Sequence, residues 1–252
     1  MIYAQSVLFD VGNTLAHLDY AYLARSLAEL GGPEVTEEGL GRADALMRLS
    51  GLLGSTRSED PADAAGRDSV DPQRRFFRRY MEGVAQHLDG AEGFGARLGD
   101  LAFEEHRRCP TGLWRIPDPE GEMVLETLTA HGIRVGAISN ADGRVRAQLA
   151  LLGFLRWLDP VIDSTEAGVT KPDPEIFALA LRQMSVPARR AVYVGDMLDV
   201  DVAGARAAGM QAVLYDRFGV MPEGAEGYVR IRCLGELVSE VLEGLSRAGS
   251  EA

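Results

Sequence analysis

Six short apolar runs, bounded by glycine, asparagine or aspartate, constrain the fold of this chain most strongly. One run lies near the N-terminus, the other five follow residue 113, and helical patterns separate them. Because the runs are apolar throughout and do not alternate, they predict strands buried on both faces of a parallel sheet that has helices on each side. The predicted strands are residues 6–11, 134–140, 159–164, 191–196, 211–216 and 228–232.

The helices between these strands carry clear start and stop signals. In "PDPEIFALALRQM", Asp173 is placed to cap the helix and Pro174 to be its first residue. Two further helices are predicted to end at Gly153 and Gly209. The sequence therefore predicts an α/β fold with a Rossmann-like parallel sheet core.

Residues 16–112 differ, because they show helical patterns only and no strand signal. The polar segment 54–72 is predicted to be a loop between helices. We expect an inserted all-helical domain at 16–112 and a core made of residues 1–15 and 113–252. The four predicted amphipathic helices are residues 21–32, 37–49, 72–88 and 94–108.

Charge and composition exclude some functions. The net charge of −12 argues against nucleic acid or an anionic membrane surface as a partner. No apolar run approaches the roughly 20 residues that span a bilayer, and the N-terminus lacks the basic start of a signal peptide. Cys109 and Cys233 do not make a disulfide framework, so we expect a cytoplasmic protein. A small anionic substrate would need a local positive pocket.

Polar side chains gather where the predicted strands end. In a doubly wound sheet, ligands bind outside the carboxyl ends of the strands. Carboxylates that lie close together there repel unless a cation compensates them, and oxygen ligands suit Mg²⁺. Serine, asparagine and lysine beside them would form a cradle for a phosphoryl or carboxylate group. The residues concerned are Asp10, Ser139, Asn140, Lys171, Asp196, Asp199 and Asp201.

Lys171 is the only lysine among the 26 cationic residues of the chain. A genome that replaces lysine by arginine wherever either residue serves would produce this bias. The remaining lysine then marks a position that arginine does not suit, because a slim ammonium reaches a buried oxyanion where a broad guanidinium does not fit.

The segments "FDVGNTL", "AISN", "KPDPEIF" and "VGDMLDVDVAGARAAGM" resemble, in this order, the four motifs of the haloacid dehalogenase superfamily. The match covers residues 5–15 and 113–240. The helical insert is similar in position and character to the type 1 cap of subfamily I. The cap carries no motif that names a substrate.

The resemblance implies roles for the residues at the strand ends. Asp10 would be the nucleophile that forms a covalent aspartyl intermediate, and Lys171 would hold it ionised. Ser139 and Asn140 would bind the transferring group, with Thr14 as a further substrate-binding residue.

The resemblance also implies a Mg²⁺ site. Asp10 and Asp196 would be ligands through their carboxylates, and Asp201 would lie behind them as an outer or water-mediated ligand. The residue two positions after the nucleophile, here Gly12, would bind through its backbone carbonyl. Glycine can fill that role as well as aspartate.

Gly12 is the main departure from the family pattern, and Asn13 replaces the glycine usual after it. Family phosphatases carry at position 12 an aspartate that protonates the leaving group and later activates water. Losing such a group costs ~10²–10⁴-fold in rate. Four nearby residues could substitute, although each is better explained as a surface, linker or capping residue. They are His17, Asp19, Asp142 and Asp199.

The motifs leave several functions open. Dehalogenase relatives lack the second acid and need no metal, but they tend to replace the acids of the fourth motif, which this chain keeps. Phosphonatase relatives need a cap lysine, and residues 16–112 contain none. A Mg²⁺-dependent phosphatase of a small phosphorylated metabolite, with weakened acid–base chemistry, agrees best with the motifs. A binding protein without activity on the same scaffold is the remaining alternative.

The arginines of the helical insert and the two tryptophans are interpreted as structural residues. "RRFFRRY" could present arginines to an anionic substrate, but helical spacing splits them over more than one face and favours a salt-bridged surface. Trp114 and Trp157 are predicted to lie in the core. The arginines concerned are Arg74, Arg75, Arg78 and Arg79.

Overall fold

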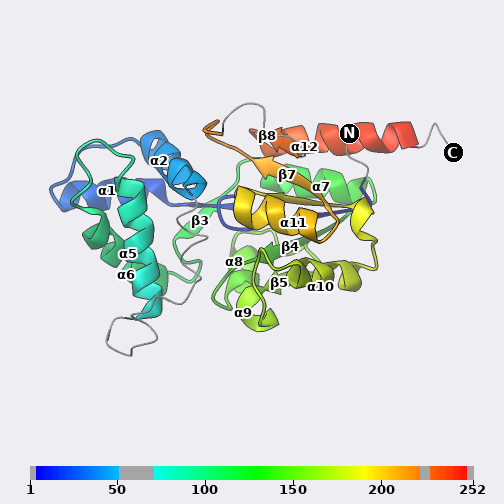
Figure 1. The fold of residues 1–252 in the computed structure, drawn as a ribbon, viewed down its shortest axis with the longest axis horizontal. Coiled ribbons are helices and arrows are strands. Elements are labelled where there is room, and N and C mark those ends of the chain that lie inside the picture. The colour runs from blue at the N-terminus through cyan, green and yellow to red at the C-terminus, as the bar shows by residue number, and fades with distance from the viewer. Residues whose placement is uncertain (1–3, 51–70, 222–227, 249–252) are drawn as a thin grey trace. The chain divides into compact units, whose positions relative to one another are not determined.

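The structure, a computed structural model, describes residues 4–50, 71–221 and 228–248. The chain divides into two units (Figure 1). The core unit comprises Met1–Leu18 and Trp114–Ala252, and the helical unit comprises Asp19–Leu113. The loop predicted at 54–72 lies outside the described residues except for its last two positions.

The core unit contains a six-stranded parallel sheet in the order β5-β4-β1-β6-β7-β8. All six predicted strands are confirmed, and so is the α/β fold class. This order places the carboxyl ends of β1, β4 and β6 next to one another. The strands are β1 (Ser6–Phe9), β4 (Arg134–Ser139), β5 (Val161–Asp163), β6 (Ala191–Gly195), β7 (Gln211–Tyr215) and β8 (Val229–Ile231).

Helices cover both faces of this sheet (Figure 1). On one face, α7 (Gly121–Ala130) and α12 (Leu234–Ala248) pack with the main apolar cluster. On the other face, Phe177 of α10 (Pro174–Met184) meets the ring of Tyr193 edge-on, with 4.9 Å between the ring centroids. The remaining helical segments are α8 (Val145–Leu151), α9 (Ser164–Ala167), η1 (Ala188–Arg190), η2 (Leu198–Val202) and α11 (Ala203–Ala207).

The predicted helix signals are confirmed where the structure describes them. The side chain of Asp173 accepts a hydrogen bond from the backbone N–H of Glu175, and Pro174 begins α10. Gly153 and Gly209 follow α8 and α11 with φ of 83° and 77°, the left-handed conformation that glycine adopts without strain.

A second, two-stranded sheet corrects the predicted domain boundary. β2 (Ala16–Leu18) pairs antiparallel with β3 (Trp114–Pro117), so the prediction of no strand within 16–112 is wrong for residues 16–18. A three-residue strand is too short to show a period, and its partner follows the whole helical unit. The core unit therefore extends to Leu18 and resumes at Trp114.

The helical unit contains the four predicted helices, within the residues that the structure describes. Its core includes the buried carboxylate of Asp44, which accepts hydrogen bonds from the hydroxyls of Tyr20 and Tyr80. That this unit serves as a cap stays a prediction. The helices are α1 (Tyr20–Glu29), α2 (Glu37–Leu49), α5 (Pro72–Ala85) and α6 (Gly95–Arg108).

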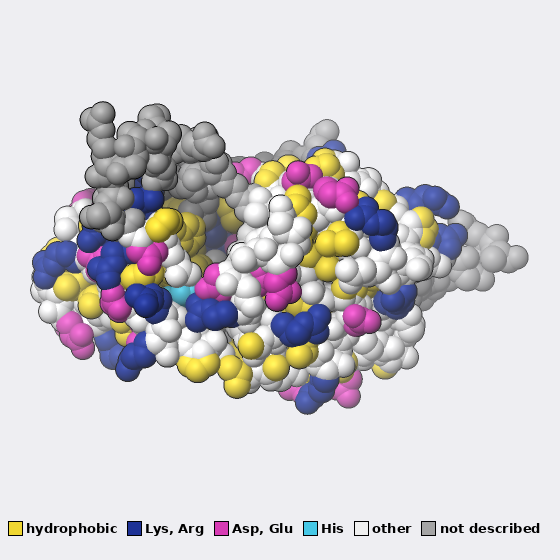
Figure 2. Space-filling view, turned by 90° about the horizontal axis from the view of Figure 1, so that it is seen from below, with side chains coloured by type: hydrophobic (Ala, Val, Ile, Leu, Met, Phe, Trp, Pro, Cys, Tyr) yellow, Lys and Arg dark blue, Asp and Glu magenta, His cyan; other side chains and the backbone are white. Residues whose placement is uncertain are grey.

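Ion pairs tie α5 to α6. Nε of Arg78 lies 2.8 Å from Oδ1 of Asp100, and Arg74 pairs with both Asp100 and Glu104. The predicted salt-bridged surface is confirmed for these two arginines. The space-filling view likewise shows basic and acidic side chains interspersed over the face it presents (Figure 2). No helix in the described residues is long and apolar enough to cross a membrane.

Candidate active site

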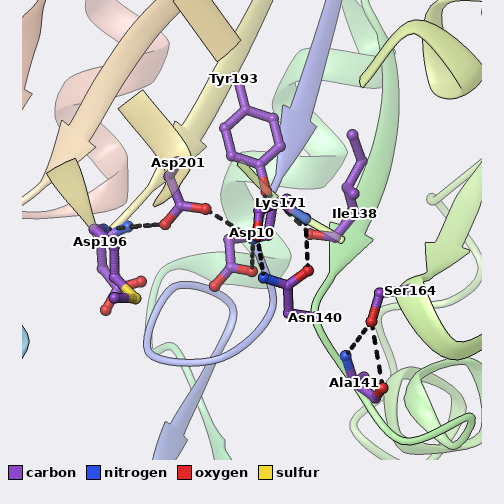
Figure 3. A network of polar contacts seen from close by, with 10 residues as sticks. Asp10, Ile138, Asn140, Ala141, Ser164, Lys171, Tyr193, Asp196 and Asp201 are labelled. Atoms are coloured by element: carbon purple, nitrogen blue, oxygen red, sulfur yellow. Dashed lines mark hydrogen bonds and ion pairs between the residues drawn. The ribbon is translucent and has the colours of Figure 1, made fainter. Parts of the chain in front are cut away.

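Three carboxylates meet at the carboxyl ends of β1 and β6 (Figure 3). Asp10 follows β1, and its backbone N–H donates to the carbonyl of Val194 at 2.8 Å, which extends the strand ladder to this residue. Asp196 follows β6, and Asp201 belongs to η2. One carboxylate oxygen from each aspartate lies within 4.8 Å of those of the other two. Oxygen donors this close favour a divalent cation.

Lys171 lies at the centre of this cluster and is buried. Its Nζ donates to Oδ1 of Asp10 at 2.5 Å, to Oδ1 of Asp201 at 2.7 Å and to the hydroxyl of Tyr193 at 2.9 Å. Three acceptors use all three N–H groups of an ammonium. The prediction that Lys171 accompanies Asp10 thus agrees with the geometry.

Tyr193 is a member of the cluster that the sequence analysis missed. Its hydroxyl accepts from Lys171 and donates to the carbonyl of Ile138 at 3.0 Å. The tyrosine thereby links β6 to β4 beneath the lysine. The available signal was a phenol in the middle of the apolar strand "AVYVGD", where a buried hydroxyl needs a partner.

Burial and the neighbouring charges shift the pKa values of Asp10 and Lys171. Burial raises the pKa of Asp10 to about 6, while the ammonium of Lys171 opposes this shift. Burial alone would lower the pKa of Lys171, but the carboxylates of Asp10 and Asp201 outweigh it and the pKa is raised. The ammonium of Lys171 pairs with Asp10 and Asp201, and Asp196 adds a third carboxylate to the cluster, so the site can accept further positive charge.

This pKa shift predicts a pH dependence of stability in metal-free protein. Folded Asp10 binds its proton more tightly than the unfolded chain does, so Asp10 lowers the unfolding free energy as pH rises from 3.8 towards 6. Relative to Asp10→Asn, whose side chain does not titrate, the wild type should lose about 3 kcal/mol across this range. Urea unfolding of both proteins from pH 4 to pH 7 measures it. Parallel pH profiles would contradict the shift.

Asp201 holds the loop that carries Asp196. Its Oδ2 accepts from the backbone N–H groups of Asp196 and Met197 at 3.1 and 3.0 Å, while its Oδ1 accepts from Lys171. A Cβ at Gly195 would lie 2.4 Å from Cγ of Asp201, so only glycine leaves room for this carboxylate. The predicted role of Asp201 as an outer metal ligand stays a prediction.

Asn140 contacts the backbone of Lys171. Its Oδ1 accepts from the N–H of Lys171 at 2.9 Å, and its Nδ2 donates to the carbonyl of the same residue at 3.1 Å. Two bonds to one residue fix the start of the lysine segment against β4. Ser139 ends β4 in register with Asp163 of β5. The predicted substrate binding by Ser139 and Asn140 remains a prediction.

The loop after Asp10 explains two further residues. Asn13 has a φ of 58°, a left-handed conformation that asparagine tolerates better than most residues with a side chain. Thr14 is fully buried, and its Oγ1 has no hydrogen-bond partner among the described residues. Buried polar atoms are almost always paired. The predicted substrate-binding role of Thr14 stays a prediction.

The model of the haloacid dehalogenase-like hydrolase family matches residues 5–209. This chain belongs to that family. As a member of the haloacid dehalogenase-like hydrolases it is an enzyme, and the cluster around Asp10 is the candidate active site.

Named relatives of this hydrolase differ in activity. A ribulose-1,5-bisphosphate 5-phosphatase from Halopiger xanaduensis is 28% identical over 84% of this chain and 85% of its own length. The haloacid dehalogenase-like hydrolase domain-containing protein 3 from Danio rerio is 34% identical over 84% of each chain. Among solved structures, a 2-haloacid dehalogenase from Pseudomonas syringae has 27% identity and a TM-score of 0.54, over 98% of this chain and 99% of that one.

His17 lies in a separate cluster of this hydrolase. Its Nε2 lies 2.8 Å from Oδ2 of Asp118, and the hydroxyl of Tyr215 donates to the same oxygen at 2.7 Å. Burial favours a higher pKa for Asp118, but the hydrogen bonds from His17 and Tyr215 outweigh it and the pKa is lowered. The interpretation of His17 as a linker-lining residue is corrected, since it is buried within β2 of the core unit.

The other three possible substitutes for the missing acid lie where the sequence placed them. Asp19 caps α1 by accepting from the N–H of Tyr22. Asp142 pairs with Arg144 at the surface, and Asp199 is exposed.

Trp114 was predicted to lie in the core. It packs against the core but is only half-buried, and it also lies beside Gly12.

Proposed function

We propose that this hydrolase is a Mg²⁺-dependent phosphatase of subfamily I with a helical type 1 cap. It acts on a small phosphorylated metabolite through a covalent intermediate on Asp10. The observation that carries the proposal is the cluster of Asp10, Asp196 and Asp201 around Lys171. A phosphatase-named relative over most of the chain supports it.

The residues present suit Mg²⁺. The three aspartates place carboxylate oxygens within 4.8 Å of one another, and these are the donors that this ion prefers. The ammonium of Lys171 pairs with Asp10 and Asp201. Asp10, Asp196 and the carbonyl of Gly12 would hold the ion, with Asp201 behind them. When bound, the ion supplies positive charge that offsets the charge of the phosphoryl group.

The chain's own residues account for the two chemical steps. A carboxylate oxygen of Asp10 attacks phosphorus, and the bond to the leaving oxygen breaks with its electron pair on that oxygen. Water then attacks the same phosphorus, restores the carboxylate and leaves inorganic phosphate. Lys171 keeps Asp10 ionised for the first step and stabilises its carboxylate as it re-forms.

Replacing Asp196 with asparagine should weaken Mg²⁺ binding at least tenfold. With Lys171 counted, the three carboxylates give the cluster a net charge of −2, so removing one of them halves the charge that attracts a divalent cation and also removes a direct ligand. Isothermal calorimetry with MgCl₂ measures the affinity. Asp199→Asn removes the same charge from an exposed residue nearby, and this variant should bind Mg²⁺ with the wild-type affinity. Equal affinity in the wild type and Asp196→Asn would contradict the assignment.

A second candidate function is 2-haloacid dehalogenation, which the solved structure from Pseudomonas syringae favours. An assay of phosphate esters and 2-haloacids, each with and without Mg²⁺, separates the two. We expect phosphate release that requires Mg²⁺ and is lost in Asp10→Asn. Halide release without Mg²⁺ would instead support the dehalogenase.

A further inference from the structure

Trp114 occupies the space beside residue 12. It begins β3, pairs with Leu18 of β2 and packs half-buried against the main apolar cluster. Its carbonyl accepts from Nε2 of Gln148 at 2.5 Å, which fixes the backbone at this point. A Cβ built on Gly12 would lie 3.5 Å from Nε1 and 3.6 Å from Cδ1 of the indole. Apart from the chain neighbours of Gly12, no other described residue comes within 4 Å of that Cβ.

The indole is therefore the side chain that faces position 12. Its N–H donates hydrogen bonds but does not ionise near neutral pH, so it cannot act as a general acid. His17 is bound to Asp118, and Asp142 is paired with Arg144. Among the described residues, a side chain at position 12 would therefore first meet an aromatic edge and not an acid.

We infer that Trp114 forms the leaving-group side of the active site. We further infer that the substrates are phosphorylated compounds whose leaving group departs without a proton, namely aryl and acyl phosphates. This inference rests on the proposed phosphatase function. A weakly basic leaving group needs no general acid, whereas an alkoxide does.

The chemistry balances without an acid at position 12. Asp10 attacks phosphorus, and the phenolate or carboxylate leaves with the bonding pair and takes no proton. Water then attacks the phosphoryl group on Asp10, the carboxylate is restored, and both protons of the water remain on the phosphate. An aryl ring leaving in this way lies against the Nε1–Cδ1 edge of Trp114.

The test is a series of phosphates with leaving groups of graded basicity, assayed with Mg²⁺. In the wild type, kcat/KM should fall at least a hundredfold from 4-nitrophenyl phosphate to an alkyl phosphate. We define the substrate ratio as kcat/KM for 4-nitrophenyl phosphate divided by kcat/KM for acetyl phosphate. Trp114→Phe should lower this ratio at least fivefold. A purely structural role would change both substrates equally. Trp157→Phe, at the other tryptophan, is the matched control and should leave the ratio within twofold.

Each result decides the inference. An unchanged ratio in Trp114→Phe, or a wild-type series that is flat with leaving-group basicity, would overturn it. If Trp114→Phe does not fold, the wild-type series decides alone. A wild type that hydrolyses no phosphate at all would overturn the proposed function on which the inference rests, because the inference presupposes activity that depends on Asp10.

Discussion

Replacing Lys171 with arginine should lower kcat/KM for phosphate hydrolysis at least a hundredfold, although the positive charge is kept. Nζ of Lys171 reaches Asp10, Asp201 and Tyr193 within 2.9 Å from a buried position. A planar guanidinium is larger and cannot meet three acceptors in this arrangement. An unpaired buried charge costs about 3–5 kcal/mol, which corresponds to ~10²–10⁴ in rate.

The matched control is the reverse exchange at the surface. Arg182 pairs with Glu175, and both side chains are more than half exposed, so Arg182→Lys should change kcat/KM less than twofold. Thermal unfolding of both variants separates a loss of activity from a loss of fold. A folded Lys171→Arg protein with activity within tenfold of the wild type would contradict the role of Lys171.

Gly12→Asp should raise hydrolysis of an alkyl phosphate at least tenfold, and that of an aryl phosphate less. The new carboxyl group would protonate an alkoxide leaving group, a contribution of ~10²–10⁴-fold in enzymes that use it. The backbone permits the change, because Gly12 is not in the left-handed region and the nearest atom to a new Cβ is 3.5 Å away. Steady-state kinetics with both substrates measures the effect.

Gly12→Asn is the control for this variant, because it has the same shape as aspartate without the acidic proton. It should leave the alkyl phosphate rate at the wild-type level. If Gly12→Asp folds, binds Mg²⁺ and hydrolyses neither ester faster, the explanation of Gly12 as a missing acid is wrong. An equal gain in Gly12→Asn would assign the effect to shape and not to proton transfer.

The sheet could be predicted because its strands are apolar on both faces and end in recognisable residues. Parallel strands buried between helices leave a local signal in every run, and parallel topology then brings Asp10 and Asp196 to one edge. The β2–β3 pair left no such signal. Ala16–Leu18 is three residues long, and its pairing with Trp114–Pro117 is a long-range contact.

The sequence predicted which residues gather at the site better than it predicted the contacts between them. The sequence placed Asn140 at the correct strand end, but not its two hydrogen bonds to the backbone of Lys171. Tyr193 resembled an ordinary strand residue, because tyrosine is common in strands. The hydrogen bonds of its hydroxyl join it to residues that are distant in the sequence. His17 was misplaced for a similar reason, since its partners Asp118 and Tyr215 are about 100 and 200 residues away.

The central claim is that Asp10 itself carries the phosphoryl group. The direct measurement is mass spectrometry of the peptide that contains Asp10, after rapid acid quench of the enzyme turning over 4-nitrophenyl phosphate with Mg²⁺. We predict that this peptide gains the mass of one phosphoryl group and that Asp10→Asn gains none. An unmodified Asp10 peptide during turnover, or an alkyl ester on Asp10 after incubation with a 2-haloacid, would contradict the account.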